Sequence, residues 1–65
     1  MNKYAVIKSE DLNGPMPQCD IVWRFTVNGT EYTGLEFGKG ETIPNLTGWT
    51  VLTGNEEFEI WEKSQ

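Results

Sequence analysis

Two glutamates, Glu57 and Glu59, have the residue type and spacing that could support acid–base chemistry. If they lie on a strand, their carboxylates share one face at a separation of about 6.6 Å, which a pair of glycosidase carboxylates could use. Such a pair also needs two environments that separate the pKa values. A chain of 65 residues offers no cleft large enough to enclose a sugar. We therefore interpret the pair as part of a solvated strand face.

Nucleophilic and metal chemistry lack their usual partners in this sequence. There is no histidine, so no imidazole can activate a hydroxyl or thiol or ligate a metal. The single cysteine, Cys19, excludes an internal disulfide and a Cys-rich zinc site, and we expect it to pack as a small hydrophobe. Residues 11–14 match only the start of a calcium loop, and the glycines at 38 and 40 lack phosphate-loop spacing. The sequence predicts no catalytic residue, cofactor or metal, and hence a protein that is not an enzyme.

The charge balance argues against direct binding to nucleic acid. Ten acidic residues against five basic ones give a formal net charge of -5. The bases are scattered along the chain, at Lys3, Lys8, Arg24, Lys39 and Lys63, whereas a phosphate-binding groove needs them clustered. Residues 1–32 carry four acids and three bases, and residues 33–65 carry six acids and two bases. The acidic second half favours a protein partner with a basic surface. Such basic surfaces include those that bind nucleic acid.

The hydropathy pattern indicates a location away from membranes. No apolar run approaches the roughly 20 residues of a membrane helix, and the first residues contain too few apolar side chains for a secretory signal. A lone cysteine fits a reducing compartment. These features predict a cytoplasmic protein.

Five alternating runs predict strands over 3–9, 19–27, 30–37, 49–53 and 56–63. Asn28-Gly29 and Gly54-Asn55 each read as a two-residue hairpin turn, and the prolines at 15 and 17 predict a loop. The expected fold is all-β: a small five-stranded antiparallel meander, as a twisted sheet or open barrel built on two tight hairpins. Residues 1–65 form one small β domain.

The two turns also predict which side chains face inward. With 28–29 as the first turn, Phe25 lies opposite Tyr32 and Trp23 opposite Gly34, where the indole covers bare backbone. With 54–55 as the second turn, an apolar face forms from 49, 51, 58 and 60. The first strand closes or caps the two faces.

The second hairpin would carry an acidic ribbon at the carboxyl end. It consists of the expected partner-binding residues Glu56, Glu57, Glu59, Trp61 and Glu62. An outward Trp61 would supply a binding hot spot, while the glutamates would steer and fit a basic surface. In the simpler alternative, glutamates on an edge strand prevent this strand from pairing with the edge strand of another molecule and keep the protein soluble. A helical terminal segment, or neutralisation of these glutamates by the protein's own lysines, would remove the basis of an inhibitory role for this ribbon.

A second patch, on the outer face of the first hairpin, consists of Val22, Leu35 and Phe37. Apolar residues on both faces of a sheet require cover on the second face. Ile43 and Leu46 in the 38–48 connection would supply it, or else the patch is a homodimer interface or partner site.

The sequence supports two hypotheses on function. The first is a non-enzymatic acidic protein-binding module, such as a phage-encoded inhibitor or nucleic-acid mimic that acts by steric occlusion. The alternative is a structural or assembly module that oligomerises through this patch.

Overall fold

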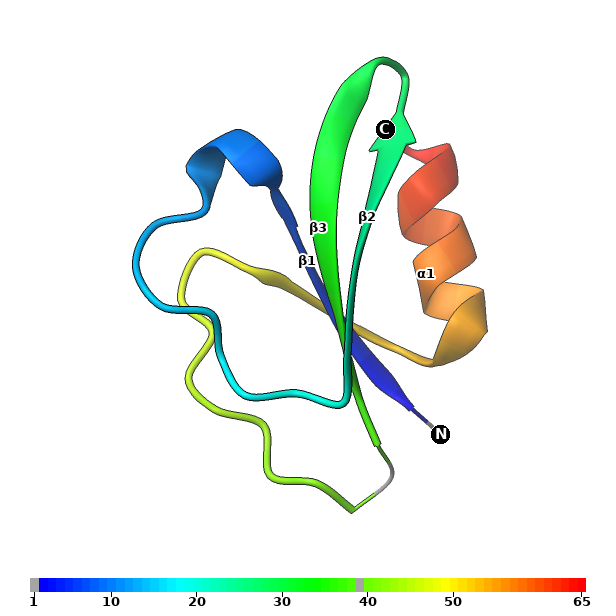
Figure 1. Ribbon diagram of the computed structural model, residues 1–65. Coiled ribbons are helices and arrows are strands. Elements are labelled where there is room, and N and C mark those ends of the chain that lie inside the picture. The colour runs from blue at the N-terminus through cyan, green and yellow to red at the C-terminus, as the bar shows by residue number, and fades with distance from the viewer. Residues whose placement is uncertain (1, 39) are drawn as a thin grey trace.

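A computed structural model of the chain describes residues 2–38 and 40–65. Met1, and Lys39 of the predicted 38–48 connection, lie outside the described residues. The chain runs through β1 (Lys3–Lys8), a short 3-10 turn η1 (Ser9–Asp11), β2 (Ile21–Val27), β3 (Thr30–Phe37), β4 (Thr50–Thr53) and the C-terminal helix α1 (Gly54–Lys63). These elements form one layer of sheet with one helix against it (Figure 1).

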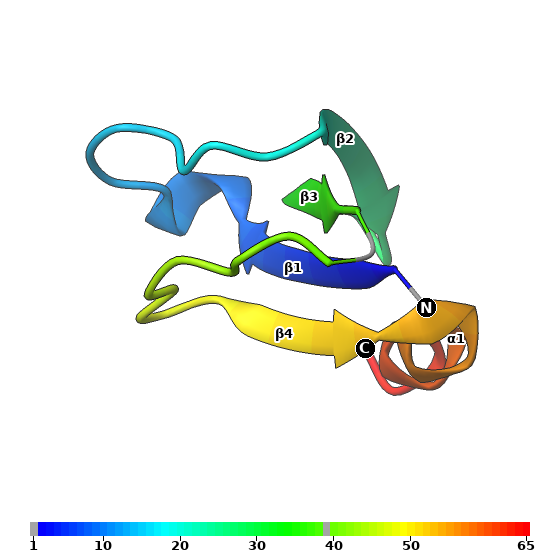
Figure 2. The same ribbon diagram turned by 90° about the horizontal axis from the view of Figure 1, so that it is seen from below.

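The four strands form an open antiparallel sheet in the order β2-β3-β1-β4. β1 and β3 are the central strands, and β2 and β4 are the two edges, which Figure 2 shows at opposite ends of the sheet. The prediction of a mostly β, antiparallel fold is confirmed. Among the described residues the sheet has four strands and is not a closed barrel. The expected fifth strand is wrong, because its residues form α1. The meander order is also wrong, because β1 lies between β3 and β4 and not beside β2.

The first predicted hairpin is confirmed in its turn and its register. Asn28 and Gly29 have φ values of 50° and 82°, the left-handed conformations that a type I′ turn requires. Phe25 then pairs with Tyr32 and Trp23 with Gly34. A Cβ on Gly34 would lie 2.6 Å from Trp23 Cζ2, so the indole does cover the bare backbone of the central strand.

The second predicted hairpin is wrong, because the segment after β4 is a helix. Gly54 has a φ of 76° and is buried, and it turns the chain from strand into helix rather than into a returning strand. Four of the ten helical residues are glutamates, and glutamate has high helix propensity. Glu56 and Glu57 lie in the first turn and Lys63 in the last, which complements the helix dipole at both ends. In this helix Phe58 and Trp61, three residues apart, share one side.

The two faces of the sheet are covered by different parts of the chain. α1 packs its aromatic residues against the face that carries Tyr4, Trp23, Phe25 and Tyr32. On the other face Ala5, Leu35 and Phe37 form the most buried cluster, and partly buried Cys19, Ile43, Leu46 and Trp49 pack against it. This confirms that the 38–48 connection covers the outer face through Ile43 and Leu46.

Two contacts fix the C-terminal end of α1 beside the β2–β3 turn. The Asn28 side-chain amide donates to the backbone carbonyl of Gln65, and the Tyr32 hydroxyl donates to Gln65 Oε1 at 3.4 Å. α1 thus starts directly after β4 and ends beside the β2–β3 turn, as Figure 1 shows. Among the described residues, no helix has the length and apolar character needed to cross a membrane.

Candidate functional site

The position of α1 is set by its first turn. The Gly54 amide donates to Asn2 O at 2.9 Å, which extends the β1–β4 pairing to the corner itself. Glu57 Oε1 accepts a hydrogen bond from the Thr53 amide at 2.9 Å. This contact satisfies a backbone donor just before the helix, as the glutamate of a capping box does. Glu57 was expected to bind a partner, and here it serves the helix of its own chain.

The inner side of α1 joins a cluster of aromatic rings. Phe58 lies 5.5 to 6.1 Å, between ring centroids, from the rings of Tyr4, Trp23 and Phe25. Trp61 meets Tyr32 edge-on at 5.0 Å. Such offset and edge-to-face pairs stabilise beyond the area they bury. Trp61 is therefore half-buried against the sheet, which corrects the expectation that it projects outward as a hot spot.

The outer side of α1 carries the acidic residues. All four predicted partner-binding glutamates are exposed on this helix: Glu56, Glu57, Glu59 and Glu62. Glu56, Glu59 and Glu62 follow one another at intervals of three, so successive carboxylates are neighbours on the helix surface. Ile60 lies on the same side of the helix, with 62% of the residue exposed. The acidic patch thus exists on a helix, with a different arrangement from the predicted ribbon.

A pocket of about 350 Å³ opens between α1 and the sheet on the acidic side. It is lined by Tyr4, Trp23, Asn55, Phe58, Glu59 and Glu62. The Tyr4 hydroxyl donates to Asn55 Oδ1 at 2.6 Å, which joins β1 to the first turn of the helix. The pocket therefore has aromatic ring surface with two carboxylates at its side.

Aromatic faces together with carboxylates form a suitable environment for an organic cation. A guanidinium or ammonium group gains attraction from the ring quadrupole and charge-assisted hydrogen bonds from carboxylate oxygens. The predicted acidic ribbon contained Glu59 and Glu62 but not their pocket neighbours Tyr4, Trp23 and Asn55. No local signal could have found them, because Tyr4 and Asn55 are 51 positions apart and meet only through the helical turn.

The second predicted patch does not exist as an exposed surface. Leu35 and Phe37 are 0% and 1% exposed, because the chain's own 38–48 connection packs over them. Val22 alone remains accessible, with 44% exposure on the edge strand β2. An oligomer interface made of all three residues is therefore incompatible with this fold.

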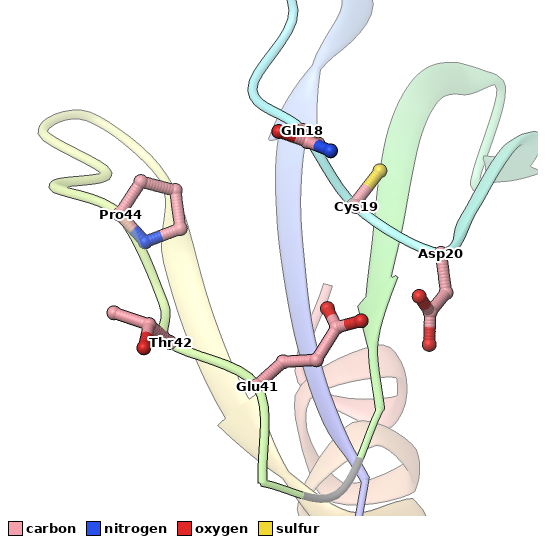
Figure 3. Close-up of a pocket in the computed structure, with 6 residues that line it drawn as sticks. All are labelled: Gln18, Cys19, Asp20, Glu41, Thr42 and Pro44. Atoms are coloured by element: carbon pink, nitrogen blue, oxygen red, sulfur yellow. The ribbon is translucent and has the colours of Figure 1, made fainter.

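A second pocket, of about 340 Å³, lies where the chain leads into β2. Figure 3 shows its lining residues Gln18, Cys19, Asp20, Glu41, Thr42 and Pro44, with the Glu41 carboxyl turned toward the Cys19–Asp20 segment. A hydrogen bond with the Asp20 carboxylate raises the pKa of Glu41 above its ordinary value of 4.5. Asp20 also lies close over Gly38, where a Cβ would be 2.6 Å from Asp20 Oδ2.

Cys19 in this pocket is a poor nucleophile. Burial raises the pKa of its thiol above 9.0, and the Asp20 and Glu41 charges raise it further. The thiol therefore stays protonated at neutral pH, whereas the thiolate is the reactive form. No group of three or more histidine, cysteine or acidic side chains that could hold a metal occurs within residues 2–38 and 40–65.

Comparison of the chain with protein-family models, with curated proteins and with solved structures finds no match.

Proposed function

We propose that this chain is a non-enzymatic protein-binding module that docks onto a basic surface of a larger protein through the outer side of α1. The pocket between α1 and the sheet would receive an arginine or lysine side chain of that partner. The observation that carries the proposal is the composition of this pocket: three aromatic side chains beside Glu59 and Glu62.

The energetics favour a cationic group over a neutral one. A cation over an aromatic face gains about 0.5–1 kcal/mol where the site is exposed, and an exposed carboxylate pair adds about 0.2–1 kcal/mol per contact. Arginine suits this pocket better than lysine, because its planar group stacks on rings and binds carboxylates through two parallel hydrogen bonds. The formal charge of -5 adds long-range attraction to a basic partner.

The predicted inhibitor mechanism takes a different form on the helix. Because the terminal segment is a helix, it forms no acidic ribbon with an outward tryptophan. In the helical form, the successive carboxylates of Glu56, Glu59 and Glu62 would occupy basic side chains on the partner and block access to them. Imitation of nucleic-acid phosphates is the narrower version of this proposal, and it applies if the blocked surface is one that binds nucleic acid.

A labelled hexa-arginine peptide tests the proposal. We expect the wild-type protein to bind it at about 50 mM salt and more weakly at about 300 mM, since exposed charges are screened beyond the Debye length. The double variant Glu59→Lys/Glu62→Lys should weaken binding by about ten-fold or more. Hexa-lysine should bind less tightly than hexa-arginine.

The matched control is Glu10→Lys/Asp11→Lys, which reverses two exposed acids in η1. Both double variants change the formal charge from -5 by four units, to -1. If the two variants weaken hexa-arginine binding equally, net charge alone explains the binding and the site proposal is refuted. Weaker hexa-arginine binding by the α1 variant alone supports the site proposal.

A further inference from the structure

The edge strand β2 is unprotected against pairing with another strand. It is seven residues long, contains no proline and has one charged side chain, Arg24. Ile21 and Val22 at its start are 50% and 44% exposed. The other edge, β4, has four residues. Natural proteins usually protect a long apolar edge with charges, prolines or a covering segment.

The edge continues one residue before β2. The Asp20 amide donates to Glu36 O at 3.0 Å, so the chain still lies beside β3 at this point, with this amide directed into the sheet and not toward the open edge. Asp20 is exposed and precedes Arg24 by four positions. A strand edge with an acid and a base at this spacing can be complementary to itself.

Symmetry restricts the registers in which two copies of β2 can pair. In an antiparallel pair related by a two-fold axis normal to the sheet, each residue faces one on the same side of the sheet. An axis at Arg24 would place the two arginines directly opposite each other, which is unfavourable. An axis at Val22 places the Arg24 of each copy opposite the Asp20 of the other.

The register centred on Val22 also matches the apolar residues. The two Val22 side chains meet at the axis, and Ile21 of each copy lies opposite Trp23 of the other. We propose that this chain forms a symmetric homodimer by antiparallel pairing of β2 with β2 of a second copy, centred on Val22, with two Asp20–Arg24 ion pairs.

The pocket at the start of β2 strengthens this assignment. Asp20 and Glu41 bring two carboxyl groups together there, as Figure 3 shows. In the proposed register, Arg24 of the second copy reaches this position and supplies positive charge to the pair. The β2 interface shares Trp23 with the pocket beside α1, but it is formed by the free edge of β2 and the Asp20–Arg24 pairs, so the dimer does not require the pocket to bind a cation.

Sedimentation equilibrium of the full chain tests the dimer. We expect a mass above the 7.4 kDa of the monomer that increases with concentration. Arg24→Asp places like charges opposite each other at both ends, and it should raise the dimer dissociation constant about 30-fold. Lys63→Asp, which makes the same charge change at the end of α1, should leave it unaltered.

Mixing two charge-reversed variants provides the decisive test. Chains with Arg24→Asp should pair with chains carrying Asp20→Arg, because both ion pairs re-form in the heterodimer. Val22→Lys should also abolish the dimer while circular dichroism shows an intact fold, since this residue is exposed. A wild-type chain that stays monomeric up to ~1 mM, or a dimer indifferent to Arg24→Asp and Val22→Lys, would overturn the proposal.

Discussion

Replacement of Gly34 by alanine tests the packing of the whole aromatic face. Gly34 lies on the central strand β3, between Val6 and Trp23. An added Cβ would lie 2.6 Å from Trp23 Cζ2 and 2.8 Å from both Cε2 and Cη2. Ordinary carbon contacts are about 3.5–4.0 Å, so the indole must move by roughly 1 Å.

The indole has little room for such a movement. It stacks on Phe25 at 5.8 Å and packs against Tyr4 and Phe58, each at 6.1 Å between centroids. Forced overpacking of this kind costs about 1–3 kcal/mol, while the loss of glycine flexibility returns about 0.4–1 kcal/mol. We expect a net destabilisation of about 1–2 kcal/mol, a large part of the ~3–5 kcal/mol that a domain of this size can hold.

Urea unfolding monitored by circular dichroism measures this change. Gly34→Ala should lower the midpoint without altering the m-value. In a Trp23→Phe background the benzo ring that meets the new methyl is gone, so the same substitution should become neutral or mildly stabilising. A Gly34→Ala chain as stable as the wild type would show that the indole does not lie over Gly34.

Three further substitutions test α1 and the pocket at the start of β2. Phe58→Ala should cost about 3–5 kcal/mol and abolish the helical circular dichroism signal, because a ten-residue helix is not stable alone; Ile60→Ala should change stability little. Glu57→Ala should cost about 1 kcal/mol by thermal melting through loss of its backbone hydrogen bond, and an equal loss from Glu56→Ala would refute that role. The raised pKa of Glu41 means that the folded state holds this proton more tightly. The stability it contributes should be complete below pH 4.5 and disappear as the pH rises through the raised pKa. The melting temperature of Glu41→Gln should not decline as the pH rises through this range.

The part of the fold nearest to local sequence signals could be predicted. Asn28-Gly29 specifies one turn geometry, and that turn fixes the register of every pair between β2 and β3. The same register placed Leu35 on an outer face that needs cover, and cover by Ile43 and Leu46 was one of the alternatives for it, which the structure confirms.

The C-terminal segment could not be predicted in this way, because its pattern fits two structures. Glu57, Phe58, Glu59 and Ile60 alternate as a strand does, and Phe58 and Trp61 also have helical spacing. With ten residues, neither period repeats often enough to decide. The glutamates of the first turn and Lys63 in the last turn were the available helix signals, but Gly54-Asn55 was interpreted as a hairpin turn.

The candidate site was only half predictable for the same reason. The acidic patch could be predicted from the composition of the C-terminal segment, because its glutamates are exposed whether the segment is a strand or a helix. The aromatic surface beside them requires the helix to lie over β1 and β2, and Tyr4 and Trp23 then become neighbours of Glu59 and Glu62. Packing between distant segments decides this arrangement, and no short motif in the sequence encodes it.

A single NMR titration shows whether the pocket beside α1 binds a cationic side chain. The three tryptophans give three indole N–H signals, and among the described lining residues Trp23 is the tryptophan in this pocket, whereas Trp49 packs on the opposite face of the sheet. On addition of hexa-arginine at low salt, the Trp23 signal should shift with saturation while that of Trp49 stays in place. Equal shifts of both signals, or a stationary Trp23 signal, would rule out binding of the cation in this pocket.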